Sequence, residues 1–170
     1  MLRLSSDEEK KILELDTRRG VYEAVQKFAG CHFREIERRS GLSTGMVKYH
    51  LSYLVRKGII SEERDRNNIR YFPKGIDQKN RKLLGFLRQN TVRKLMLFII
   101  DNPGCNHKQT VKAVNISPSV VSWHMKKLKG HGIIEFIRSG RKTLYNALID
   151  ENDIFSLMSA YHDSFDPHLP

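Results

Sequence analysis

Two short segments of the chain combine hydroxyl, lysine and aromatic side chains at a spacing that suits binding. The first contains Ser43, Thr44, Gly45, Lys48, Tyr49 and Ser52, and the second contains Ser117, Ser119, Ser122, Trp123 and Lys126. Small hydroxyl side chains allow a helix to approach the floor of a DNA groove, and lysines and aromatics beside them can reach phosphates or thymine methyl groups. The chemistry that these residues predict is contact with double-stranded DNA.

A third set of candidate residues consists of basic side chains near two expected hairpin turns. They are Arg64, Arg66 and Arg70 in the first hairpin and Arg138, Arg141 and Lys142 in the second. Basic residues on a projecting hairpin suit a neighbouring phosphate backbone or the minor groove. Ordinary solvated turn charges are the alternative interpretation of these residues.

The charge of the chain is strongly positive and unevenly distributed. The formal net charge is +11, and residues 1–76 contribute 16 basic and 11 acidic residues, a balance of +5. Residues 77–149 contribute 14 against 3, a balance of +11, and residues 150–170 contribute none against 5, a balance of −5. A positive field attracts a polyanion. We therefore expect the second half of the body to bind non-specific duplex more tightly than the first half.

The sequence repeats itself at a shift of 74 residues without any gap. Identical residues then coincide in pairs: Thr17 with Thr91, Gly30 with Gly104, Cys31 with Cys105, Ser43 with Ser117, His50 with His124, and Gly58 with Gly132. Apolar positions between these pairs also agree, which a chance match would not maintain. One small domain is therefore expected to occur twice.

Local signals predict three helices and a hairpin in the first copy. A helix capped by Asp16 or Thr17 should end at Gly30, and a second should span about 33–39. Ser43 should cap a third helix that ends before Gly58. Two short strands, 59–64 and 69–72, should form the hairpin around a turn at 65–68.

The second copy predicts the same order of elements. Its helices should span 91–102 and 107–114, and a third should begin after Ser117 with Pro118 at the first helical position. Its strands should span 133–138 and 143–148. Residues 79–89 are interpreted as a linker helix, and 150–165 as an amphipathic terminal helix with Ile154, Leu157, Met158 and Tyr161 on one face.

These elements predict a mainly α fold with small β-hairpin wings, arranged as two tandem winged helix-turn-helix domains. The expected boundaries are 1–76 for the first domain, 77–90 for the linker helix, 91–149 for the second domain and 150–170 for the terminal helix and acidic tail. In a helix-turn-helix the second helix enters the major groove. The apolar face of the terminal helix predicts a homodimer, and a monomer whose two copies act as an internal pseudo-dimer is the alternative.

Other kinds of chemistry find less support in the sequence. The glycines form neither a G-x-G-x-x-G motif nor a P-loop, so we expect no enzyme and no cofactor. Cys31, His32, Cys105 and His107 lack the close spacing of a zinc site, and the cysteines are expected to be small buried thiols. His50 and His124 are expected to be half-buried or to contact phosphates. A protein-docking module of a transcription or replication complex is the alternative function.

The longest apolar run, Leu95–Ile100, is far shorter than a membrane-spanning helix needs, so no membrane partner is expected. Two cysteines do not make a disulfide framework, and the absence of a visible signal peptide completes the expectation of a cytoplasmic protein.

The residues quoted above also carry a resemblance to a known group of proteins. Residues 32–51, Gly58-Ile59-Ile60 and residues 70–73 look like winged-helix regulators of the archaeal, ArsR/MarR-like kind, and residues 103–134 give the companion pattern. Two such copies in one chain resemble archaeal tandem winged-helix transcription regulators, a group that includes the euryarchaeal archaellum regulator. The resemblance covers residues 16–149. It implies the fold and DNA binding, and it does not identify the gene that is controlled.

Overall fold

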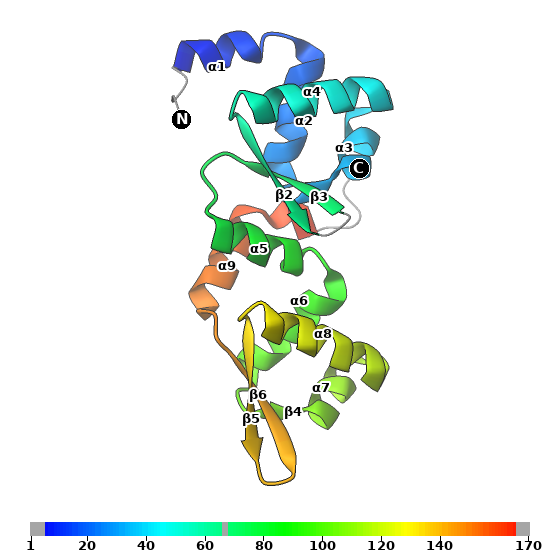
Figure 1. Cartoon of the computed structure of the whole chain (residues 1–170), viewed down its shortest axis with the longest axis vertical. Coiled ribbons are helices and arrows are strands. Elements are labelled where there is room, and N and C mark those ends of the chain that lie inside the picture. The colour runs from blue at the N-terminus through cyan, green and yellow to red at the C-terminus, as the bar shows by residue number, and fades with distance from the viewer. Residues whose placement is uncertain (1–5, 66–67, 166–170) are drawn as a thin grey trace. The chain divides into compact units, whose positions relative to one another are not determined.

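The computed structural model describes residues 6–65 and 68–165 (Figure 1). The chain divides into two compact units, one of Met1–Gly85 with Tyr161–Pro170 and one of Phe86–Ala160. The division falls inside helix α5 (Gln78–Leu87), in the segment predicted as a linker helix. Within the described ranges, none of the helices combines the length and the apolar character that crossing a membrane requires.

The first unit contains a helix-turn-helix and a three-stranded antiparallel sheet. Its elements are α1 (Ser6–Ile12), α2 (Asp16–Lys27), β1 (Cys31–His32), α3 (Phe33–Ser40), α4 (Thr44–Arg56), β2 (Ile60–Asp65), β3 (Asn68–Pro73), the beginning of α5, and a 3-10 turn, η1 (His162–Phe165). The strand order is β1-β3-β2. The hairpin of β2 and β3 is the predicted wing.

The helix-turn-helix of this unit forms because each helix has a local stop or start signal. Gly41 ends α3 in the left-handed conformation, with a φ of 65°, which glycine adopts without steric cost. Ser43 caps α4, and its side-chain oxygen accepts a hydrogen bond from the Met46 N–H. Val47 and Leu54 then lie on the buried face of α4 at helical spacing.

The second unit repeats this arrangement. Its elements are α6 (Asn90–Asp101), β4 (Cys105–Asn106), α7 (His107–Val114), α8 (Pro118–Gly130), β5 (Ile134–Ser139), β6 (Lys142–Ala147) and α9 (Glu151–Ala160). The strand order is β4-β6-β5. Asn115, with a φ of 52°, takes the position of Gly41, and Ser117 caps α8 as Ser43 caps α4.

The two sheets confirm the sequence repeat in register. Cys31 pairs with Tyr71 in the first sheet, and Cys105 pairs with Tyr145, 74 residues later, in the second. Gly58 and Gly132 lie just after the ends of α4 and α8, and their φ angles are 66° and 67°. The prediction of two tandem winged helix-turn-helix domains, mainly α with small β wings, is therefore confirmed.

Several details differ from the sequence-based expectations. The two-residue strands β1 and β4 add a third strand to each wing, and α1 precedes the first copy. Leu15, rather than Asp16 or Thr17, is the N-cap of α2, and it makes no side-chain capping hydrogen bond. The terminal helix ends at Ala160, before the 3-10 turn, rather than at residue 165.

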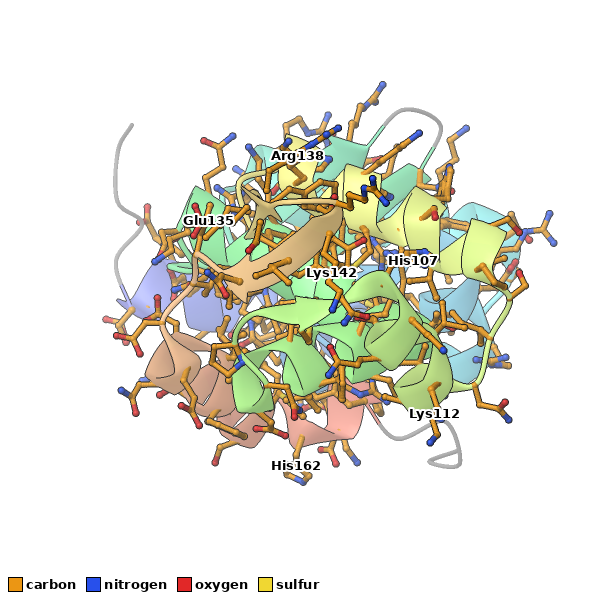
Figure 2. The ribbon with its side chains drawn as sticks, turned by 90° about the horizontal axis from the view of Figure 1, so that it is seen from below. His107, Lys112, Glu135, Arg138, Lys142 and His162 are labelled. Carbon is orange, nitrogen blue, oxygen red and sulfur yellow. The ribbon has the colours of Figure 1, made fainter. Side chains whose placement is uncertain are left out.

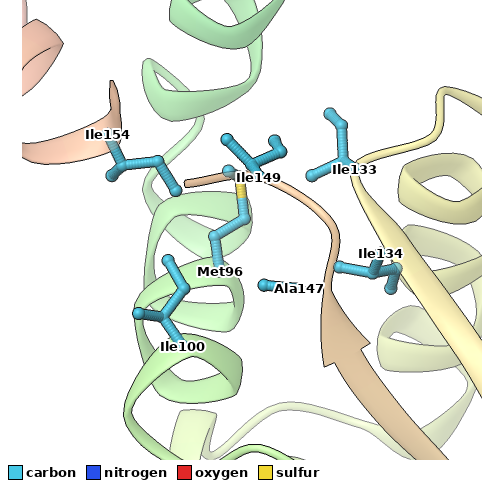
Figure 3. A pocket seen from close by; sticks show the side chains of 7 residues that line it. All are labelled: Met96, Ile100, Ile133, Ile134, Ala147, Ile149 and Ile154. Carbon is cyan, nitrogen blue, oxygen red and sulfur yellow. The ribbon is translucent and has the colours of Figure 1, made fainter. Parts of the chain in front are cut away.

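Helix α9 packs on the second copy through part of its apolar face. Ile154 is fully buried and Leu157 is buried, while Phe155 is 46% exposed. Figure 3 shows Ile154 in an apolar cluster at the foot of the second wing, together with Met96, Ile100, Ile133, Ile134, Ala147 and Ile149. Burial of these aliphatic side chains fixes α9 to the second unit.

Candidate nucleic-acid interface

Helix α4 presents the predicted site residues of the first copy to solvent. Ser43, Thr44, Gly45, Lys48, Tyr49 and Ser52 are all exposed. The opposite face of the helix is closed, because Val47, Leu51 and Leu54 pack in the core. The helix is therefore held from behind, and its polar and aromatic side chains point outward.

A groove of about 750 Å³ lies between α4, the start of α3 and the first wing. Its lining residues are His32, Phe33, Arg34, Thr44, Lys48, Ser52, Glu62, Arg64, Asn68, Ile69 and Tyr71. The structure thus brings Thr44, Lys48, Ser52 and Arg64 together around one groove. Phe33, Arg34 and Asn68 were missed, because spacing along α3 and β3 does not reveal which residues face a groove formed with another element.

Carboxylates partly balance the positive charge of this groove. The Thr44 hydroxyl donates a hydrogen bond to the Glu37 carboxylate across the turn between α3 and α4. Arg64 Nε lies 3.9 Å from Glu62 Oε1 on the same strand, and the Arg64 side chain remains 72% exposed. The first copy therefore presents mixed charge.

One predicted wing residue of the first copy, Arg70, is bonded inside the unit. Arg70 does not lie at the wing tip, because its Nη1 donates a 2.8 Å hydrogen bond to the Gly30 carbonyl. The same guanidinium arm also runs close to the backbone of Gly85. The expected position of Arg70 at the tip is thus corrected to one inside the first unit. Arg66 lies outside the described residues.

Helix α8 presents the second set of predicted residues. Ser117, Ser119, Trp123 and Lys126 are exposed. Ser122 is half-buried, and a 2.9 Å hydrogen bond joins its Oγ to His107 Nε2 at the start of α7. His107 was missed as a site residue, because its partner lies 15 positions away and the helical spacing of either helix alone does not show the contact.

The exposed charged side chains of the second wing are all basic. Arg138, Arg141 and Lys142 are all exposed, and Figure 2 shows Arg138 and Lys142 on the β5–β6 hairpin. In Figure 1 this hairpin extends beyond the helices of its own unit. Residues 102–149 contain one acidic residue, Glu135, whose carboxylate accepts a hydrogen bond from Asn146. A phosphate backbone would meet little repulsion here.

The two outer helices, α4 and α8, each expose one large aromatic side chain that packs against the histidine after it. Tyr49 is 58% exposed and Trp123 is 57% exposed. The ring centroids of Tyr49 and His50 lie 5.3 Å apart, and those of Trp123 and His124 lie 4.8 Å apart, both edge to face. The aromatic rings are therefore supported on one side and open to solvent on the other.

The two histidines have supporting positions below these rings. His50 is 3% exposed, and its Nε2 lies 3.2 Å from Thr17 Oγ1. Burial, with a smaller effect of the Arg18 charge, lowers the pKa of His50. Burial and then the Lys127 charge lower the pKa of His124, which is half-buried. The first histidine is more deeply buried than the sequence suggested.

The residues considered for a metal site were Cys31, His32, Cys105 and His107. Cys31 and Cys105 are both buried. Burial raises the pKa of the Cys105 thiol, whose Sγ lies 3.7 Å from Thr110 Oγ1. Within residues 6–65 and 68–165, His, Cys, Asp and Glu side chains do not gather in a group of three or more that could hold a metal ion.

Family models match both copies of the domain. A model of an N-terminal HTH domain matches residues 15–84, and a model of winged helix-turn-helix DNA-binding matches residues 88–135. A protein from Methanocaldococcus jannaschii, named an uncharacterized HTH-type transcriptional regulator, is 26% identical over 143 residues, which are 84% of this chain. The chain spans 36% of the length of that curated relative.

Two solved structures show limited likeness. A predicted DNA-binding transcriptional regulator from E. coli is 18% identical and matches 46% of this chain and 81% of its own, with a TM-score of 0.41. The DIP2311 protein from Corynebacterium diphtheriae is 8% identical and matches 78% of this chain and 26% of its own, with a TM-score of 0.33. Scores this low carry no conclusion about the fold.

The family-model matches agree with the geometry of each unit, in which a capped outer helix and a hairpin wing stand on a common core. Together with the archaeal relative, they confirm the resemblance stated from the sequence. The chain is therefore a tandem winged helix-turn-helix protein similar to the archaeal transcription regulators of that architecture.

Proposed function

We propose that this chain regulates transcription by binding specific sequences of double-stranded DNA with both of its copies. Helices α4 and α8 enter major grooves, and the two hairpin wings contact the phosphate backbone or the minor groove. The observation that carries this proposal is the exposed face of α8 beside the basic second wing. The second unit thus combines the exposed face of α8 with the basic wing residues Arg138, Arg141 and Lys142.

The helix ends support close approach to a groove floor. Thr44 and Gly45 open α4, and Ser119 lies in the first turn of α8, so small side chains occupy the ends that enter first. Lys48 and Lys126 lie further along the exposed faces, where an ammonium group reaches base edges or phosphates. Each copy thus offers a short surface on which small side chains are followed along the helix by a lysine.

Assembly into a homodimer through the C-terminal helix remains part of the proposal. Ile154 and Leu157 are buried within one chain, so a second copy would have to use the exposed side of α9, where Phe155 lies. Light scattering of the full chain at micromolar concentration distinguishes the two states. A dimer that becomes a folded monomer on Phe155→Glu substitution supports the proposal, and a wild-type monomer contradicts it.

Selection from a randomised duplex pool tests sequence-specific binding directly. The full chain should enrich a defined motif, and Lys126→Ala should relax the motif at one position while leaving the others unchanged. Arg141→Ala, on the wing, is the matched control and should weaken all sequences evenly. Retention of duplex with no enriched motif would reduce the function to non-specific binding, and no retention at low salt would contradict DNA binding.

A further inference from the structure

The exposed faces of α4 and α8 share an apolar pair at identical positions of the repeat. Met46 is 40% exposed and Tyr49 is 58% exposed on α4. On α8, Val120 is 43% exposed and Trp123 is 57% exposed, each one repeat of 74 residues later. The members of each pair are three residues apart, so they lie beside one another on one side of their helix. Each pair forms a small contiguous apolar surface, repeated in both copies, that an apolar partner would cover.

The side chains that read adenine by paired hydrogen bonds are absent from these two helices, and those that read guanine are lysines and one arginine. Arginine or lysine reads guanine with two hydrogen bonds, and asparagine or glutamine reads adenine in the same way. Helices α4 and α8 contain no asparagine, glutamine or acidic residue over their described lengths, and Arg56, the last residue of α4, is their sole arginine. Direct reading by these helices therefore depends on hydroxyls, lysines and the apolar pairs.

One group in the major groove is apolar, and it is the C5-methyl group of thymine. The exposed aromatic rings are prepared to meet it, because the histidine that follows each ring holds it edge to face at 5.3 Å or 4.8 Å. His50 is itself buried and bonded to Thr17. The ring of Tyr49 therefore loses little further freedom when it binds.

We infer that Met46 with Tyr49, and Val120 with Trp123, read thymine methyl groups, so that each copy prefers thymine at the position its apolar pair meets. This inference rests on the proposed function, since it requires α4 and α8 to lie in major grooves. It adds the chemical identity of the bases that are read. The repeat places the same preference in both copies, which predicts a target with a thymine-containing element for each helix.

Replacement of thymine by uracil isolates the methyl group, because the two bases pair identically with adenine. The probe is a pair of alternating duplexes of equal length, one of dA and dT and one of dA and dU, titrated with the full chain at low salt. Burial of one methyl-sized group corresponds to about a fourfold change in affinity. With one methyl read by each copy, the dT duplex should bind roughly fourfold to sixteenfold more tightly than the dU duplex.

Single variants assign this preference to the apolar pairs. Tyr49→Ala and Trp123→Ala should each lower the ratio of dT to dU affinity by about fourfold, whatever their effect on total affinity. Both side chains are exposed, so each variant should unfold at the wild-type temperature. A thermal melt of each variant checks that it folds. Leu148→Ala is the matched control, because Leu148 is an apolar side chain of similar exposure (56%) outside α4, α8 and α9, and it should leave the ratio unchanged.

The outcomes separate the inference from the proposed function. A wild-type ratio near one, with duplex binding retained, overturns methyl reading and leaves DNA binding in place. A high ratio that neither Tyr49→Ala nor Trp123→Ala lowers also overturns it, because the methyl is then read elsewhere or through DNA shape. Failure to bind either duplex contradicts the proposed function itself. A ratio that falls in both variants and persists in Leu148→Ala supports the inference.

Discussion

The two copies of the domain share their fold and differ in the side chains that they expose on the outer helix and the wing. Glu37 and Glu62 lie beside the outer helix and wing of the first copy, where they contact Thr44 and Arg64. The positions one repeat later hold Val111 and Phe136, so the second copy lacks both carboxylates. Repeated caps, glycines and core residues maintain the fold, which leaves the surface residues to diverge. We therefore expect the second copy to provide most of the electrostatic attraction to DNA.

The polar contacts of the two outer helices differ in the same way. Lys48 of α4 corresponds to Ser122 of α8, which is joined to His107, while Ser52 of α4 corresponds to Lys126. The exposed lysine therefore lies about one helical turn further along in the second copy. If both helices enter the major groove in the same orientation, the two copies read different positions of their targets.

The largest effect should follow from reversing charge on the second wing. Arg138→Glu with Lys142→Glu should lower the affinity for random-sequence duplex by about a hundredfold near 0.1 M salt, at about tenfold for each lost phosphate contact. Arg64→Glu in the first wing should cost less than tenfold, because Glu62 already offsets that charge. Binding measured by fluorescence anisotropy would contradict the comparison if the two wings gave equal losses per residue.

A smaller effect should come from the lysines of the outer helices. Lys48→Ala and Lys126→Ala should each cost about 1–3 kcal/mol at a specific site and relax the preference at one base pair. Competition binding with single-base variants of the selected site measures both quantities. If either substitution weakens all sequences equally, that lysine contacts phosphates alone, and the two helices do not read different positions.

Removing the carboxylates of the first copy should move it toward the second. Glu37→Gln keeps an acceptor for the Thr44 hydroxyl while removing a charge, and Glu62→Gln frees Arg64 from its ion pair. Together they should raise non-specific affinity by several-fold at low salt, with less effect at high salt. Glu135→Gln, in the second copy, is the matched control. An unchanged affinity in the double variant would show that the first face does not contact the duplex backbone.

The smallest expected effect concerns stability against pH. The pKa of His50 is lowered below its ordinary value of 6.5 by burial and by Arg18, so the folded state favours the neutral ring. The neutral His50 ring contributes its full stability to the folded state above pH 6.5, and this stability is lost as the pH falls below 6.5. The reason is that the unfolded chain takes up the proton first. Thermal unfolding should shift down by a few degrees between about pH 7.5 and about pH 5.5.

The two copies should differ in this respect as well. His50→Gln should flatten the pH dependence of unfolding more than His124→Gln, because His124 is half-buried and His50 is nearly inaccessible. Circular dichroism melts of both variants measure the two slopes. Equal flattening by the two substitutions would show that the deeper burial of His50 has no consequence for its protonation.

The sequence predicts the frame of this protein well because its signals are local. Ser43 and Ser117 cap the helices that follow them, and Gly41 ends a helix in the left-handed conformation. These features follow from residue type and position. The strands β1 and β4 were missed because two residues show no periodicity. Short-range patterns also do not reveal contacts between elements, which is why the partners of Arg70, Thr44 and Ser122 emerged only from the structure.

A salt titration of the full chain on a random-sequence duplex tests the central claim most directly. The logarithm of affinity should fall linearly with the logarithm of salt concentration, with a slope of about −0.9 for each phosphate contacted. The Arg138→Glu and Lys142→Glu double variant should lose about two contacts from that slope, and Arg64→Glu should lose less than one. An affinity that does not depend on salt, or a slope that the second wing does not change, would contradict the account.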